Sequence, residues 1–203
     1  MAYERKFKIG KPILEVNNIS LAFGGVKAIT DTSFNVLEHE VRAIIGPNGA
    51  GKSSMLNCIN GIYKPQQGTV SFRGQVVPNI TPNIMAQMGL SRTFQNLALF
   101  KRMSVLDNIL VGRKLHTKTN FLEVALQLPK VKKEEELNRE RSEEIISFLE
   151  IEDIKNTPVG KLPYGLQKKV ELGRALATDS SIILLDEPMA GMNVEEKRDM
   201  CRF

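Results

Sequence analysis

Residues 46–53 of this 203-residue chain form a glycine-rich segment whose residue types and spacing suit the binding of phosphate groups. Glycine lets the backbone curl so that successive N–H groups point inward at phosphate oxygens, and a following helix aims its positive end at the same anion. Lys52 can reach the β- and γ-phosphates of a nucleotide, and the Ser53 hydroxyl can hold Mg²⁺. We therefore predict a nucleoside triphosphate site, the alternative being a simple glycine-rich turn. The expected nucleotide contacts are Gly46, Pro47, Asn48, Gly49, Ala50, Gly51, Lys52, Ser53 and Ser54.

Two adjacent carboxylates, Asp186 and Glu187, follow the apolar run 182–185. Carboxylates placed side by side repel each other, so a purely structural pair in a buried position would be costly. We expect them to have different functions instead. Asp186 would orient the Mg²⁺ shell through water, and Glu187 would polarise the water that attacks the γ-phosphate.

A phosphate loop of this kind needs a strand before it and a helix after it, and the sequence supplies this order. The apolar run 41–45, broken only by Arg42, suits a buried parallel strand that leads directly into the loop. Helical spacing follows at Met55, Leu56 and Ile59. Patterning elsewhere predicts strands within 14–19, 34–36 and 182–185, a hairpin within 69–77, helices within 104–156 and a helix that starts near 163.

Composition favours one globular domain, since the chain is 42% hydrophobic and 25% charged. The longest apolar run is far shorter than a membrane span, and the N-terminus has no apolar stretch typical of a secretory signal, so we expect a cytosolic chain. Cys58 and Cys201 are expected to be reduced thiols because no C-x-x-C spacing occurs. The net charge of +5 is spread among acidic residues without a basic block, which argues against nucleic acid as a partner.

Residues 162–167, Leu-Pro-Tyr-Gly-Leu-Gln, resemble the signature region of ABC ATPases, which is usually L-S-G-G-Q before a helix. Gln95 in RTFQN resembles the Q-loop glutamine of that family. Phe23 stands where the family places an aromatic side chain that stacks on adenine, although such a residue could also belong to the core. Within the superfamily, the segments LAFGGVKAITDTSF and GLSRTFQNLALFKRMSVLDNILVG are most similar to the ATPase of bacterial branched-chain amino acid importers.

The resemblance covers residues 14–203 and implies an α/β fold of the P-loop NTPase class. That fold has a mixed sheet core, an N-terminal antiparallel β part and a helical insert, here at 96–160, within a single domain 1–203. The implied cofactors are ATP and Mg²⁺, bound between two head-to-tail copies. The implied catalytic residues are Glu187 and Gln95, and the implied metal-site residues are Ser53, Gln95 and Asp186.

The resemblance also implies partners and a location. A second ATPase subunit would supply its Gly165 region to the nucleotide, and transmembrane permease subunits would use the energy to import branched-chain amino acids or a similar small solute. A periplasmic or extracellular solute-binding protein would take part indirectly, and nucleic acid would not. The chain would be cytoplasmic, peripheral to the inner (plasma) membrane through the permease.

Several positions depart from the family pattern. Pro163 replaces the usual signature serine and Leu166 the usual glutamine, so the signature should act mainly through the Gly165 backbone and the helix N-terminus. His39 stands where a glycine is common and is expected to be an exposed turn residue. The chain ends 16 residues after Glu187, before a switch histidine could occur, so it resembles a C-terminally truncated member.

Three alternatives remain open from the sequence. The chain could be a soluble ABC ATPase of another process, a nucleotide-binding fragment with little turnover or, least favoured, a P-loop kinase or GTPase. The apolar residues Leu97, Leu99 and Phe100 could receive a helix of the permease or could be ordinary core.

Overall fold

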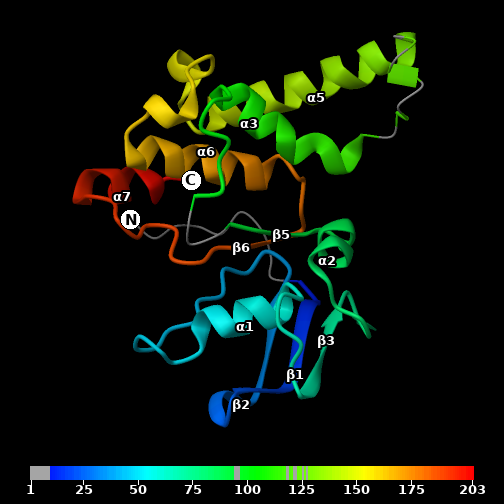
Figure 1. Ribbon diagram of the computed structural model, residues 1–203, viewed down its shortest axis with the longest axis vertical. Helices are drawn as coiled ribbons and strands as arrows, with labels where there is room; N and C mark the ends of the chain where they lie inside the picture. The colour runs from blue at the N-terminus through cyan, green and yellow to red at the C-terminus, as the bar shows by residue number, and fades with distance from the viewer. Residues whose placement is uncertain (1–9, 94–96, 118, 121–122, 125, 127) are drawn as a thin grey trace. The chain divides into compact units, whose positions relative to one another are not determined.

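The computed structural model describes residues 10–93, 97–117, 119–120, 123–124, 126 and 128–203. The chain divides into two compact units, Met1–Met88 and Gly89–Phe203 (Figure 1). Each unit has its own sheet, and the two are described separately below.

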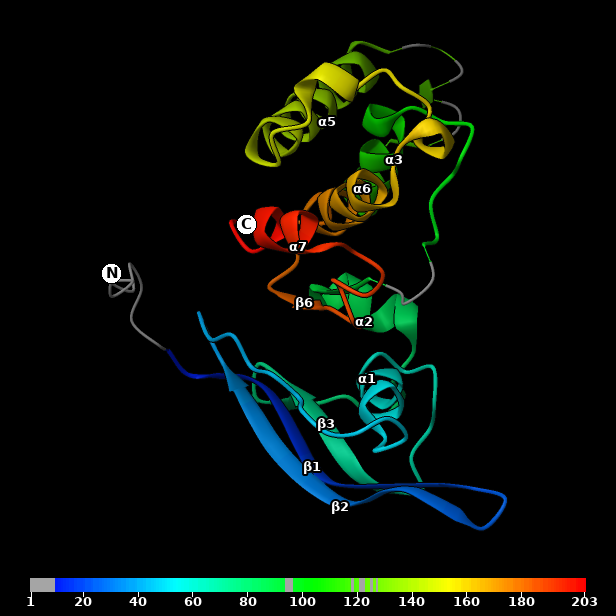
Figure 2. The same cartoon turned by 90° about the vertical axis from the view of Figure 1, so that its left-hand side faces the viewer.

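The first unit is built on an antiparallel sheet with the strand order β2-β1-β3-β4. Its strands are β1 Pro12–Phe23, β2 Val26–Leu37, β3 Gln67–Phe72 and β4 Gln75–Val76. Figure 2 shows β1 and β2 as two long neighbouring strands, with β3 beside β1. Apolar side chains of β1 and β3 are buried, as alternation in half-buried strands requires. The predicted N-terminal antiparallel part is therefore confirmed.

The turn between β3 and β4 explains why this hairpin could be predicted from the sequence. Arg73 and Gly74 both have positive φ, 49° and 75°, which is the two-residue geometry that matches the twist of antiparallel strands. Two helices complete the unit, α1 Lys52–Ile59 and α2 Pro82–Met88. Met55, Cys58 and Ile59 form the buried side of α1.

The predicted strand at 41–45 does not form, so this prediction is wrong. Residues 40–47 have no regular secondary structure, and Val41 and Ile45 are 99% and 91% exposed. A strand needs a neighbour for its N–H and C=O groups, and none of the strands β1 to β4 pairs with this segment. Ala43 and Ile44 line a cavity of about 400 Å³ that β2 also lines.

The second unit combines a short parallel sheet with a helical layer. Strands β5 Leu90–Arg92 and β6 Ile182–Leu184 pair in parallel, so the unit has the pairing expected of an α/β fold. Parallel and antiparallel pairs thus occur in separate sheets. The helices are α3 Val105–Gly112, α5 Pro129–Phe148, α6 Tyr164–Leu176 and α7 Val194–Met200, with 3₁₀ helices η1 Arg113–His116, η2 Glu152–Ile154 and η3 Val159–Lys161.

The core of this unit lies among α3, α5 and α6 (Figure 1). Ile109 of α3, Ile146 of α5 and Val170 of α6 are almost fully buried in it. This packing fixes α6, and the segment after α6 leads into β6. Among the described residues, no helix is both long enough and apolar enough to cross a membrane.

Candidate functional site

The glycine-rich loop ends at Gly51, which immediately precedes α1 and has a φ of 82°. Left-handed backbone of this kind favours glycine, and a Cβ at Gly51 would overlap the carbonyl oxygen of Ala28 in β2. Lys52 Nζ donates hydrogen bonds to the carbonyl oxygens of Gly46 and Pro47, at 2.9 and 2.8 Å. The loop is therefore curled, with its only cationic side chain folded over it.

The loop fits a phosphate group for three reasons. Gly51 has no side chain to cap α1, so the first N–H groups of the helix lack the usual side-chain acceptor. The sequence Lys-Ser-Ser-Met of the first turn contains no acidic residue that would repel an anion. The side of Gly49 where a Cβ would project is open, with a φ of 83° and no atom of the described residues within 4 Å.

Phe23 lies at the end of β1 and is 46% exposed, so the alternative that it is a core residue does not hold. Its ring meets the ring of Tyr63 edge to face, with the centroids 5.1 Å apart. The exposed part of the ring suits stacking against a planar group.

The adjacent carboxylates after β6 lie in different environments. Asp186 is buried, whereas Glu187 is exposed and has a φ of 47°. A non-glycine residue in left-handed backbone costs free energy, and such strain is concentrated at functional positions. The two residues therefore differ in burial and backbone conformation, and their separate functions stay a prediction.

Asp186 has a partner that the sequence analysis missed. Arg92 of β5 donates from Nη2 to Oδ2 of Asp186 at 3.0 Å, and these side chains are 5% and 7% exposed. Arg92 is the last residue of β5, and a buried guanidinium there needs a nearby carboxylate. The sequence carries no local signal for this pair, because the two residues are 94 positions apart.

Metal binding by this chain would depend on few protein ligands. Groups of three or more His, Cys, Asp or Glu side chains that could hold a metal ion do not occur in the described part of the chain. Mg²⁺ commonly takes one or two protein ligands together with phosphate oxygens. The Ser53 hydroxyl in the first unit and the Asp186 carboxylate in the second are each oxygen groups of the kind that Mg²⁺ takes.

Gly165 lies in the first turn of α6 and is buried. The position that its Cβ would take is occupied by the carboxylate of Glu196, from the first turn of α7. Oε2 of Glu196 also accepts a hydrogen bond from the Asn193 N–H at 2.9 Å, as part of a capping box. A carboxylate of the chain itself therefore lies against the turn that was expected to face a phosphate.

The remaining residues that the sequence singles out differ in how exposed their side chains are. Gln95 lies outside the described residues. Leu97 and Leu99 are half-buried, with Leu99 packed against the helical core, whereas Phe100 is 51% exposed. His39 is an exposed turn residue with a φ of 62°, as predicted.

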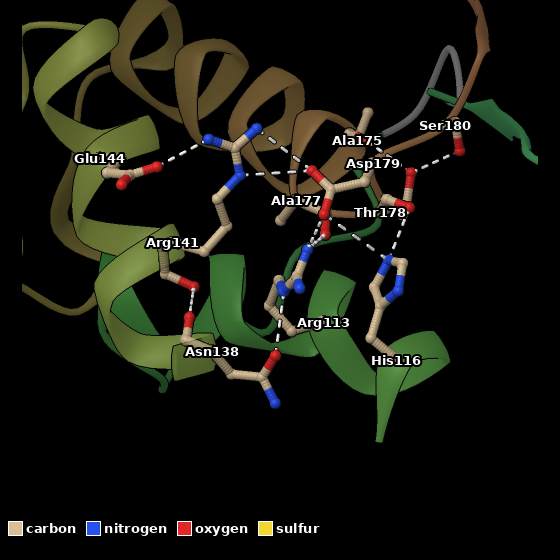
Figure 3. Close-up of polar contacts among 11 residues, drawn as sticks. Arg113, His116, Asn138, Arg141, Glu144, Ala175, Ala177, Thr178, Asp179 and Ser180 are labelled. Carbon is tan, nitrogen blue, oxygen red and sulfur yellow. Dashed lines mark hydrogen bonds and ion pairs between the residues drawn. The ribbon is translucent and has the colours of Figure 1, made fainter. Parts of the chain in front are cut away.

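An ion-pair network that the sequence analysis did not anticipate surrounds Asp179 (Figure 3). Arg113 of η1 pairs with Oδ2 of Asp179, and Arg141 of α5 donates to Oδ1 at 3.2 Å. Arg113 also donates to the Asn138 side chain at 3.1 Å, and His116 Nε2 lies 2.9 Å from the Thr178 carbonyl oxygen. The network links η1 and α5 to the segment that connects α6 with β6.

The arginines also determine the charge state of Asp179. Partial burial of this carboxyl group would raise its pKa, but the hydrogen bonds and positive charges of Arg113 and Arg141 outweigh burial and lower the pKa below its ordinary value of 3.8. Asp179 is therefore ionised at neutral pH, which keeps the network intact.

Fold and site together define a nucleotide-binding α/β protein, and comparison with known families specifies the class. The family model described as ABC transporter matches residues 29–190, so the chain belongs to the ABC transporter family. The ABC ATPase predicted from the sequence is thereby confirmed, together with its P-loop NTPase fold.

Individual relatives narrow the similarity further. The chain is 35% identical to the high-affinity branched-chain amino acid transport ATP-binding protein BraF of Pseudomonas aeruginosa over 192 residues, 95% of this chain and 75% of BraF. It is 33% identical to LivG of Escherichia coli K12, a protein of the same description, with the same coverage. The solved ADP conformation of MJ1267, an ATP-binding cassette of an ABC transporter, matches with a TM-score of 0.79 and 36% identity, covering 94% of this chain and 74% of that chain.

Proposed function

We propose that this chain is the ATP-binding and ATP-hydrolysing subunit of an importer for branched-chain amino acids or a similar small solute. The curled loop carries the proposal, because its geometry suits a triphosphate and its backbone positions admit few residues other than glycine. Relatives that are 35% and 33% identical to this chain over 192 residues are named as branched-chain amino acid transport ATP-binding proteins, which supports the choice of solute.

Each predicted residue has a role in this proposal. The main-chain N–H groups of residues 46–54, apart from Pro47, and the Lys52 ammonium bind the phosphates, and Phe23 stacks on the adenine. Mg²⁺, when bound with the nucleotide, offsets the negative charge of the phosphates, and Ser53, Gln95 and Asp186 would hold it. Glu187 accepts a proton from the attacking water while Gln95 helps to orient that water.

The proposed assembly contains a second ATPase subunit, whose Gly165 region approaches the nucleotide across the interface. Permease subunits couple hydrolysis to import, a solute-binding protein delivers the solute, and the chain is held at the cytoplasmic face of the membrane. Nucleic acid has no part in it. We also propose one ATPase domain over 1–203 with its helical insert at 96–160, which the family match across both units supports.

The direct test is removal of the Lys52 ammonium. Lys52→Ala should weaken the binding of labelled ATP by at least about 100-fold, since charge-assisted hydrogen bonds to phosphate are among the strongest in proteins. Equilibrium dialysis with Mg²⁺ at moderate salt measures this. Lys11→Ala, which removes an exposed lysine elsewhere in the first unit, is the control and should bind as the parent does.

The same two variants test the solute. In cells whose own copy is replaced, Lys52→Ala should lower the uptake of labelled leucine, isoleucine and valine to that of a deletion strain, and Lys11→Ala should leave it unchanged. Normal uptake of all three by a variant that no longer binds ATP would reject the proposed solute class. Equal ATP binding by Lys52→Ala and the parent would reject the loop as the site.

A further inference from the structure

The register of the parallel sheet brings Arg92 to the end of β6. Arg92 pairs with Leu184, and the N–H of Thr93 donates to the Leu184 carbonyl oxygen at 3.0 Å. Parallel strands end at the same edge of a sheet, so the side chain of Arg92 can reach the residue that follows β6 by two positions. That residue is Asp186, whose Oδ2 lies 3.0 Å from Nη2 of Arg92.

This pair is more enclosed than the Arg113–Asp179 pair of the same unit. The exposed fractions of its side chains are 5% and 7%, whereas in the Arg113–Asp179 pair they are 9% and 36%. A charge-assisted hydrogen bond between enclosed side chains is strong and directional, so it holds the oxygen that accepts it in place. In this pair that oxygen is Oδ2 of Asp186, which Nη2 of Arg92 contacts.

Simple core packing does not account for residues 91–93, which are the end of β5 and the residue after it. The hydroxyl groups of Ser91 and Thr93, on either side of Arg92, are buried without a hydrogen-bond partner among the described residues. A strand that only filled a core would have apolar residues at these places, because buried polar groups cost free energy. Three successive polar side chains in the interior indicate that β5 supports the end of β6.

We infer that Arg92 is a positioning residue for Asp186, which it holds in the orientation needed for the Mg²⁺ shell of the bound nucleotide. This inference rests on the proposed function, in which Asp186 faces that shell. Groups that orient a metal ligand from behind typically contribute about 10–100-fold to metal affinity. Loss of Arg92 should therefore lower the affinity of the nucleotide complex for Mg²⁺ more than it lowers Mg²⁺-free nucleotide binding.

The test uses the full chain, a fluorescent ATP analogue and a titration with Mg²⁺. Arg92→Met should raise the half-saturating Mg²⁺ concentration by at least about tenfold. Binding of the analogue in excess EDTA should stay within about twofold of the parent, because Lys52 and the loop are unchanged. Arg92→Lys keeps the charge but loses the planar guanidinium group. Its half-saturating Mg²⁺ concentration should lie between those of the parent and Arg92→Met.

Arg113→Met is the matched control, because it also removes a buried arginine from an Arg–Asp pair of the second unit. It should lower the melting temperature without changing the half-saturating Mg²⁺ concentration. If Arg92→Met behaves like Arg113→Met, or lowers the Mg²⁺ requirement, Arg92 does not position Asp186. If Arg92→Met fails to fold, Arg92→Lys decides: a parental Mg²⁺ titration by that variant overturns the inference. A parent that binds no analogue under any condition would instead reject the proposed function.

Discussion

The phosphate loop of the first unit and the carboxylate end of β6 in the second are built in opposite ways. The loop is largely exposed, and its features come from main-chain N–H groups, two glycines in left-handed backbone and one lysine. At the end of β6 the Asp186 side chain is buried and is held by the Arg92 guanidinium. A site for an anion can thus be made mainly from backbone conformation with one lysine, whereas a buried carboxylate needs an enclosed counter-charge.

Removing the carboxylate of Glu187 gives the largest expected effect and separates binding from chemistry. Glu187→Gln should reduce ATP hydrolysis by about 10²–10⁴-fold, since the amide cannot accept the proton of the attacking water. ATP binding should persist because the loop is intact. Phosphate release and dialysis on the same preparation measure both. Glu195→Gln, at a nearby exposed position of α7, is the control; unchanged hydrolysis by Glu187→Gln would exclude Glu187 as the base.

A methyl group in the loop tests whether backbone conformation governs the anion site. Gly51→Ala places a Cβ against the Ala28 carbonyl oxygen in left-handed backbone. Strain of at least about 1–2 kcal/mol should weaken ATP binding about tenfold or more. Gly49→Ala has similar backbone strain but open space, so it should lose less affinity. Isothermal titration of both variants gives the difference, and equal losses would show that the contact with β2 is unimportant.

Asp179 precedes β6, whereas Asp186 follows it. We expect Asp179 to stabilise the folded state and to have no part in ATP binding. Its pKa is lowered in the folded state, so its contribution to stability is present above the unfolded pKa, near 3.8, and is lost as pH falls through the folded pKa. Asp179→Asn should therefore be less stable than the parent at pH 7, with a difference that shrinks below pH 3.8. Urea denaturation across this range measures it. A difference that is independent of pH would mean that the carboxylate charge is unimportant, and altered ATP binding at pH 7 would mean that Asp179 also serves the site.

The smallest expected effect concerns the two thiols, one in each unit. Cys58, on the buried side of α1, has its pKa raised by burial from 9.0 to about 11, so its thiolate fraction at pH 7.5 is about a hundredfold lower than that of an ordinary thiol. Iodoacetamide should modify the exposed Cys201 and spare Cys58. Peptide mass spectrometry locates the label, and urea provides the control in which both react. Rapid native labelling of Cys58 would show that α1 opens readily.

The sequence predicts the elements whose conformation depends on residues close together in the chain. The loop, the hairpin turn at Arg73–Gly74 and helix α6 depend on residues that are neighbours in the sequence. The largely apolar run 41–45 predicts a strand, but strand formation depends on a hydrogen-bonding neighbour that composition does not specify.

The missed parts of the site depend on contacts between distant residues. Arg92 and Asp186 are 94 positions apart, and Arg113 and Asp179 are 66 apart. These pairs follow from the register of β5 on β6 and from the packing of η1 beside the end of α6. No periodicity in a single sequence encodes either arrangement.

The carboxylate of Glu196 lies against the first turn of α6, so it competes with any outside anion that would bind there. An anion from another molecule would have to displace a group that the chain itself supplies at high effective concentration, so its apparent affinity falls by the fraction of time for which the turn is covered. Displacement of this side chain would also remove its hydrogen bond to the Asn193 N–H, which helps to begin α7. Binding of an outside anion at the turn and loosening of the start of α7 are thus thermodynamically linked. Each favours the other, because both require the Glu196 carboxylate to leave the turn.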